Sequence, residues 1–111
     1  MNLLRIRLEN ESQFSLPTPL HEGKDAPSSK TAAEHENSQG IFGIWECSPG
    51  QFQRQVKQAE FSYIITGEGR FIPISGEPIT FKTGDSLYFE PHTQGTWEIT
   101  KTVRKAYFIV K

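Results

Sequence analysis

EFSYIITG, residues 60–67, carries the pattern that decides the fold. Large side chains at Phe61, Tyr63 and Ile65 alternate with other residues, and a glycine ends the run. Period-two alternation rich in aromatic and β-branched residues predicts a strand with two different faces. Residues 83–95 repeat the design, with a strand between the turn residues TGD and Pro91. Two such strands predict a small closed β-sheet with a pocket inside.

The same pattern extends from residue 40 to the end of the sequence. Turn pairs such as Pro49-Gly50 and Ser75-Gly76 divide this part into short segments. Short strands joined by glycine and proline turns are typical of an all-β sandwich or barrel. The predicted strands are Ile41–Cys47, Phe52–Lys57, Glu60–Thr66, Gly69–Ile74, Pro78–Lys82, Ser86–Glu90, Gly95–Thr100 and Val103–Val110.

The first forty residues differ in composition from the rest. Leu4, Ile6 and Leu8 alternate with arginines, which predicts an amphipathic strand at a sheet edge. Residues 9–40 are rich in Ser, Glu, Asn, Pro and Lys, so we expect an extended polar loop draped on or near the barrel. A short strand near 14–16 and a helical turn over 31–35 are options within it. The predicted organisation is an edge strand plus loop over 1–40 and a barrel over 41–111.

Length and charge narrow the class of protein. The 111 residues fit one domain. Twelve basic and 13 acidic residues give a net charge of -1, which argues against nucleic acid and against an anionic membrane surface as partners.

The single cysteine, Cys47, excludes an internal disulfide and favours a reducing cytoplasm. We interpret it as a buried, inert thiol. No apolar run is long enough to span a bilayer.

Five ordered runs between Gly43 and Val110 carry a resemblance to a known family: GIWECSPG, EFSYIITG, GDSLYFEP, GTWEI and VRKAYFIV. Together they resemble the small RmlC-like cupins, in particular the DUF861-like subfamily of ureidoglycine aminohydrolase type. The resemblance covers residue 41 to the end. It implies an all-β, double-stranded β-helix (jelly-roll) barrel, commonly assembled as a homodimer.

The resemblance also locates the metal-ligand positions of cupins. It places the glutamate ligand at Glu60, and the first two histidine positions on Arg54 and Val56 or, in the other register, on Val56 and Gln58. The histidine of the second motif has become Thr96. Imidazole suits transition metals, and one carboxylate alone holds them weakly. We therefore expect no metal; if one binds, the candidates are manganese, zinc and iron.

The histidines of the chain do not restore this ligand set. We interpret all three as solvated surface residues: His21, His35 and His92. The alternative is that the amino-terminal loop folds over the barrel mouth. The EHE triplet at 34–36 would then bring His35 and a neighbouring glutamate to Glu60.

Strand parity and the resemblance select the residues expected to line the pocket. Glu60 and Ser62 share one strand face, Thr96 and Glu98 share another, and the resemblance places both faces inside. An inward Arg54 would pair with Glu60, and Lys105 is the other candidate counter-ion. The predicted ligand-binding residues are Arg54, Glu60, Ser62, Tyr88, Thr96 and Glu98. We expect Trp45 and Trp97 in the core or at an interface.

Two carboxylates in one cavity raise the proton affinity of at least one of them, so Glu60 and Glu98 are the candidate acid–base pair. The interpretation that we favour is that Glu98 only neutralises Lys105 or Arg104. Three functions stay open on these grounds. The first is binding of a small polar, nitrogen-containing metabolite without the usual histidine–metal centre. The second is an enzyme related to ureidoglycine aminohydrolase that uses the pocket carboxylates and an atypical metal. The third is a structural dimerisation module.

Overall fold

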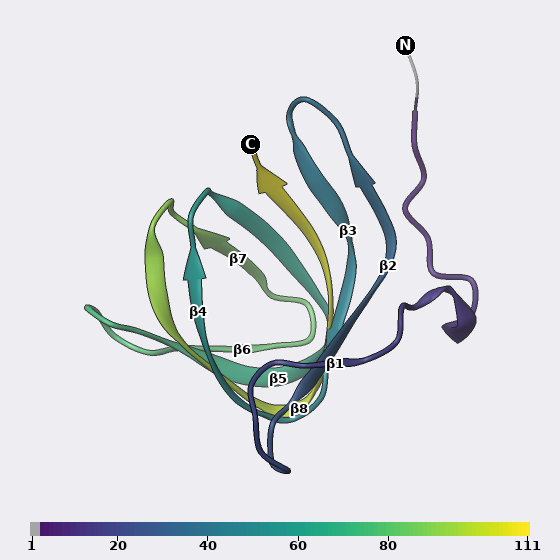
Figure 1. Cartoon of the computed structure of the whole chain (residues 1–111). Coiled ribbons are helices and arrows are strands. Elements are labelled where there is room, and N and C mark those ends of the chain that lie inside the picture. Colours follow the sequence, from purple (N-terminus) through teal and green to yellow (C-terminus); the bar gives the residue numbers. More distant parts are fainter. Residues whose placement is uncertain (1–2) are drawn as a thin grey trace.

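The computed structural model describes residues 3–111, which form antiparallel strands and one short 3-10 turn (Figure 1). No helical segment of this part is long and apolar enough to cross a membrane. The elements in chain order are η1 (Glu11–Gln13), β1 (Thr18–Pro19), β2 (Ser28–Glu36), β3 (Gly40–Cys47), β4 (Gly50–Val56), β5 (Glu60–Pro73), β6 (Ile79–Lys82), β7 (Ser86–Phe89) and β8 (Thr93–Val110).

The strands form one sheet that curls on itself, with the order β1-β2-β3-β8-β5-β6. Strand β4 pairs with β8, and β7 pairs with β5. The long strand β8 pairs with β4 through its first half and with β3 through its second half, while β5 runs beside both halves. Figure 1 shows these two strands curving through the middle of the molecule. This architecture confirms the predicted all-β jelly-roll barrel.

Strands β5 and β8 each join two segments that we predicted as separate strands. The breaks in the pattern mark irregularities within a continuous strand, because the register of β5 against β8 shifts between Ile64 and Gly69. Gly67 has a φ of +116°, and a Cβ there would lie 2.6 Å from the Cα of Val103. Glycine is therefore required where β5 bends past β8.

The amino-terminal region departs from the prediction in three places. Residues 3–9 form no strand, although Ile6 and Leu8 are half-buried between exposed arginines.

Residues 28–36, which we expected in a loop with a helical turn, form β2 and pair with β3. A bulge between Ala32 and His35 interrupts the alternation, and Ala33 has a φ of 53°. Pairing with β3 overrides a local sequence of weak β propensity. The short strand expected near 14–16 is replaced by β1 at 18–19.

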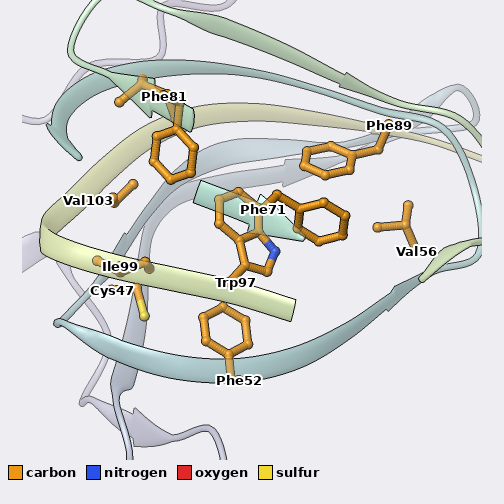
Figure 2. Packing of buried hydrophobic residues seen from close by; sticks show 10 residues of the cluster. Cys47, Phe52, Val56, Phe71, Phe81, Phe89, Trp97, Ile99 and Val103 are labelled. Atoms are coloured by element: carbon orange, nitrogen blue, oxygen red, sulfur yellow. The ribbon is translucent and has the colours of Figure 1, made fainter. Parts of the chain in front are cut away.

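Aromatic side chains packed around Trp97 form the core of the barrel (Figure 2). Phe52 stacks on this indole, and Phe71 and Phe81 meet it edge-on. The buried cluster comprises Cys47, Phe52, Val56, Ile64, Phe71, Phe81, Phe89, Trp97, Ile99 and Val103. Cys47 is fully buried, and burial raises the pKa of its thiol to about 12, as expected of an inert cysteine.

Candidate functional site

A partly open cavity of about 190 Å³ lies inside the barrel, against the aromatic core; we call it the barrel cavity. Residues from β2, β3, β4, β5 and β8 and from the loop before β2 surround it. Its apolar wall consists of Leu20, Trp45, Phe52, Trp97 and Ile109. Its polar residues are Thr31, Glu34, Arg54, Glu60, Lys105 and Tyr107.

Glu60 is the most heavily engaged polar group of the barrel cavity. Its Oε2 accepts hydrogen bonds from Lys105 Nζ at 2.8 Å and from Ser62 Oγ at 2.9 Å. Its Oε1 accepts one from Arg54 Nη2 at 3.2 Å. Strand β4 carries Arg54 on the same face as the buried residues Phe52 and Val56, which directs it inward. Both counter-ions proposed from the sequence therefore bind Glu60 at once.

The charges of this cluster stabilise one another. Burial would raise the pKa of Glu60, but the Lys105 charge, the hydrogen bonds from Lys105 and Ser62 and the Arg54 charge together lower it. Burial lowers the pKa of Lys105, and Glu60 opposes that effect. Glu60 is consequently an ionised carboxylate at neutral pH, which makes it a poor general acid and a weak base.

Lys105 fills the space in front of Glu60. Its Nζ lies 4.7 Å from the ring centroid of Trp45 and 4.9 Å from that of Trp97. The ammonium group thus combines an ion pair with two cation–π contacts in a desolvated position. Within residues 3–111, no three His, Cys, Asp or Glu side chains gather closely enough to hold a metal ion.

Tyr107 and Glu34 form a second polar pair in the barrel cavity. Tyr107 donates a hydrogen bond of 2.6 Å from its hydroxyl to Glu34 Oε2. Burial raises the pKa of Tyr107, and the bond to Glu34 raises it further, so the hydroxyl keeps its proton. The β2 bulge at Ala33 lies against Gly43, where a Cβ would come within 2.9 Å of the Glu34 Cα. Bulges commonly re-aim a side chain in this way.

The structure brings only part of the predicted ligand-binding set together. Arg54 and Glu60 line the barrel cavity, and Ser62 is buried as a donor to Glu60. Tyr88 lies on the outside, with 64% of its surface exposed. Thr96 lines a different, external groove.

Glu98 also lies outside the barrel, contrary to the predicted facing. Its neighbours Trp97 and Ile99 point into the core, and a shift of one residue along a strand exchanges its two faces. Glu98 forms an ion pair with Arg70 and accepts a hydrogen bond from Gln51, so it neutralises neither Lys105 nor Arg104. Glu60 and Glu98 do not share a cavity and cannot act as an acid–base pair in it.

The EHE triplet divides between the two faces of the sheet. Glu34 reaches the barrel cavity, whereas His35 stacks on Phe42 with 5.7 Å between ring centroids, outside the cavity. Glu36 pairs with Lys111. Neither Glu34 nor Tyr107 was predicted to line the pocket on the interpretation that we favoured. The signal for Tyr107 was present, because it alternates in step with the buried Val103 and Lys105.

Comparison with known proteins places this geometry in context. A family model described as an EutQ-like cupin domain matches residues 34–107. A DUF861 family protein from Thermotoga maritima is 25% identical, with a TM-score of 0.59 over 61% of this chain and 77% of that one. The EutQ protein of Clostridium difficile is 16% identical, with a TM-score of 0.69 over 96% of this chain and 80% of that one. A DUF861 family protein of unknown function from Pseudomonas syringae pv. tomato is 24% identical, with a TM-score of 0.70 over 87% of this chain and 45% of that one. The last two likenesses, at lower identity, show the fold alone. No curated protein matches the chain.

Proposed function

Because the chain belongs to the family of EutQ-like cupin domains, we propose that its barrel binds a small polar, nitrogen-containing metabolite without a histidine-held metal. The observation that carries this proposal is the ammonium group of Lys105, 2.8 Å from Glu60 Oε2. A cation supplied by the chain itself sits against the one carboxylate that matches a cupin metal ligand.

The residues around Glu60 do not fit a metal ion. Both of its carboxylate oxygens already accept hydrogen bonds from cationic groups. The other carboxylate of the barrel cavity, Glu34, accepts a hydrogen bond from Tyr107. A divalent ion in this place would be repelled by Arg54 and Lys105, whose charges it would have to approach closely. We therefore derive no chemical step through a metal.

Two groups of the barrel cavity remain open to a ligand. Arg54 uses Nη2 on Glu60, and its side chain is still 41% exposed. Glu34 is exposed and has a second oxygen beside the one that Tyr107 contacts. A guanidinium group donates to oxygen acceptors and a carboxylate accepts from N–H groups. The volume of about 190 Å³ lies below the roughly 300–1,000 Å³ of drug-sized sites. These features support a small ligand that carries both oxygen and nitrogen.

A thermal-shift screen of small amides, amines, ureido compounds and amino acids tests this proposal. A ligand that binds only the native state must raise Tm. Arg54→Gln should abolish the rise, and Arg70→Gln is the matched control, because Arg70 is similarly exposed at 47% but pairs with Glu98 on the outside. A screen without any stabilising compound, or an equal rise in Arg54→Gln, would contradict the proposal. Stoichiometric manganese, zinc or iron in the purified protein would overturn its metal-free part.

An enzyme related to ureidoglycine aminohydrolase is the proposal that we rank second. The ordered sequence runs between residues 43 and 110 support it. The lowered pKa of Glu60 and the external position of Glu98 weigh against it. Assaying ureidoglycine turnover with and without added Mn²⁺ decides between the two. Turnover that is lost in Glu60→Gln with the fold intact would reverse our ranking.

We also propose that the outer face of the barrel mediates self-association. Five ring-bearing residues lie opposite one another across neighbouring strands: His35, Phe42, Phe108, Phe61 and Tyr88. The groove along this outer ladder is lined by uncharged residues, and Phe61 is 52% exposed. A second copy presents the same uncharged surface, which suits the isologous contact of a two-fold dimer.

A further inference from the structure

His21 has a backbone carbonyl oxygen in front of each ring nitrogen. Nδ1 lies 2.8 Å from the oxygen of Glu22, and Nε2 lies 2.9 Å from the oxygen of Gln51. A carbonyl oxygen only accepts, and a neutral imidazole carries a single N–H. Both hydrogen bonds can therefore form together only when the ring is protonated.

These bonds fasten the loop of residues 20–27 to β4. The loop is closed on itself by a hydrogen bond of 2.9 Å from Leu20 N to the Pro27 oxygen. At the carboxyl end of the loop, the fully buried Pro27 packs on Gly50, where a Cβ would come within 2.9 Å of the proline ring. Its near end is held to β4 by His21 through the carbonyl of Gln51.

Leu20 connects this fastening to the barrel cavity. It lines the cavity and packs against the buried core cluster. Leu20 also lines the external groove in which His21 lies, together with Phe52 and Thr96. A movement of the loop away from β4 would withdraw Leu20 from the cavity wall.

We propose that residues 20–27 form a pH-dependent lid over the barrel cavity, fastened by the imidazolium of His21 and loosened when that ring loses its proton. The inference rests on the proposed function of the cavity as a binding site and adds its regulation. Ligand exchange should be slower under mildly acidic conditions, when the lid is fastened, and faster above neutral pH.

The charged groups around His21 are few. Within the loop they are Glu22, Lys24 and Asp25, and on β8 it is Glu98, which accepts a bond from Gln51 Nε2. None of them forms an ion pair with His21 in the described part of the chain. The two carbonyl contacts raise the pKa of His21 above its ordinary value and outweigh burial, which lowers it. A raised pKa means that the fastening is complete at lower pH and is lost as the pH rises through that value.

The two tryptophans report on the lid without any ligand, because Trp45 and Trp97 both line the barrel cavity. We expect acrylamide to quench their fluorescence more strongly as the pH rises between about 5 and 8, the range in which histidine titrates. The midpoint should coincide with the His21 pKa measured by NMR, which should lie above about 6.5. Quenching that does not change with pH, or a lower His21 pKa, would overturn the proposal.

His21→Gln keeps one donor for the Gln51 oxygen but cannot titrate, so its quenching should be independent of pH. His92→Asn is the matched control: His92 lies exposed in a turn with a φ of 68°, a conformation that asparagine tolerates. This variant should keep the wild-type pH dependence. The same dependence in His21→Gln would refute the lid. The measurement needs no bound metabolite, so a failed ligand screen leaves its result intact.

Discussion

Lys105 Nζ lies 2.8 Å from Glu60 Oε2 inside the barrel, and the two side chains are only 7% and 3% exposed. Every group that contacts this pair belongs to the same chain. Ser62 and Arg54 donate hydrogen bonds to the Glu60 carboxylate. The indole rings of Trp45 and Trp97 lie 4.7 Å and 4.9 Å from the Lys105 ammonium group. A buried pair of this kind costs desolvation, so its net effect on stability is small compared with the cost of breaking it.

Replacing Lys105 by methionine should destabilise the protein strongly. The change leaves the Glu60 charge buried with Arg54 as its remaining cation, and breaking a buried pair costs about 3–5 kcal/mol. Urea denaturation measures the loss. Lys101→Met is the control, because Lys101 forms an ion pair with Glu68 while 70% exposed, and we expect a change within about 1 kcal/mol. Equal stabilities of the two variants would show that the buried pair does not form.

Glu60 should make the protein sensitive to acid. Its pKa is lowered in the folded state from an ordinary value of 4.5, so the unfolded chain takes up the proton first as the pH falls. The stabilisation is complete above that ordinary value and is lost as the pH falls through the folded pKa. Urea midpoints measured from neutral pH down to about pH 3 should fall less steeply in Glu60→Gln than in the wild type. Parallel curves would count against the lowered pKa.

Tyr107 should be the last tyrosine to ionise. Burial and the hydrogen bond to Glu34 raise the pKa of its hydroxyl. An alkaline titration followed by ultraviolet absorbance should show one late step among the three tyrosines, and Tyr107→Phe should remove that step. The same variant should cost about 1 kcal/mol, because it deletes one hydrogen bond and leaves Glu34 open to solvent. If the late step persists in Tyr107→Phe, the assignment is wrong.

A charge in the outer ladder should separate a dimer. Phe61→Glu places a carboxylate on the surface that we propose for self-association, and like charges would then face one another across a two-fold axis. Sedimentation should show a monomer for this variant and a dimer for the wild type. Ile79→Glu is the matched control, since Ile79 is equally exposed at 53% but lies on β6, outside the ladder. A wild-type monomer would remove the proposal.

The barrel strands could be predicted from the sequence because alternation is a property of residues that are neighbours along the chain. The alternation of Phe61, Tyr63 and Ile65 predicted the strand, and the resemblance placed its Glu60 and Ser62 face correctly on the buried side. The expected partners of Glu60 were also found, since a buried carboxylate must be paired. The prediction for β2 failed because a bulge breaks its alternation and its order comes from pairing with β3.

The facing of Thr96 and Glu98 went wrong for a different reason. The alternation of Trp97 and Ile99 favoured the opposite face, but the resemblance assigned Thr96 to a vanished histidine position. Packing of Trp97 among the other rings of the core fixes the facing of this strand. The apolar pattern was therefore the better guide at this point.

The sequence by itself determined that the chain is an all-β barrel, that Glu60 is buried, and that the usual imidazole ligands are missing from their positions. The strands follow from residue type and period-two spacing, whereas the buried face of Glu60 and the positions of the missing ligands follow from the resemblance to cupins; neither needs knowledge of distant contacts. Only the tertiary structure decided what occupies the space beside Glu60, because Lys105 is 45 positions away along the chain and arrives through the pairing of β5 with β8. It likewise decided that Glu34 joins the cavity, since a bulge and the lack of a side chain at Gly43 turn it inward.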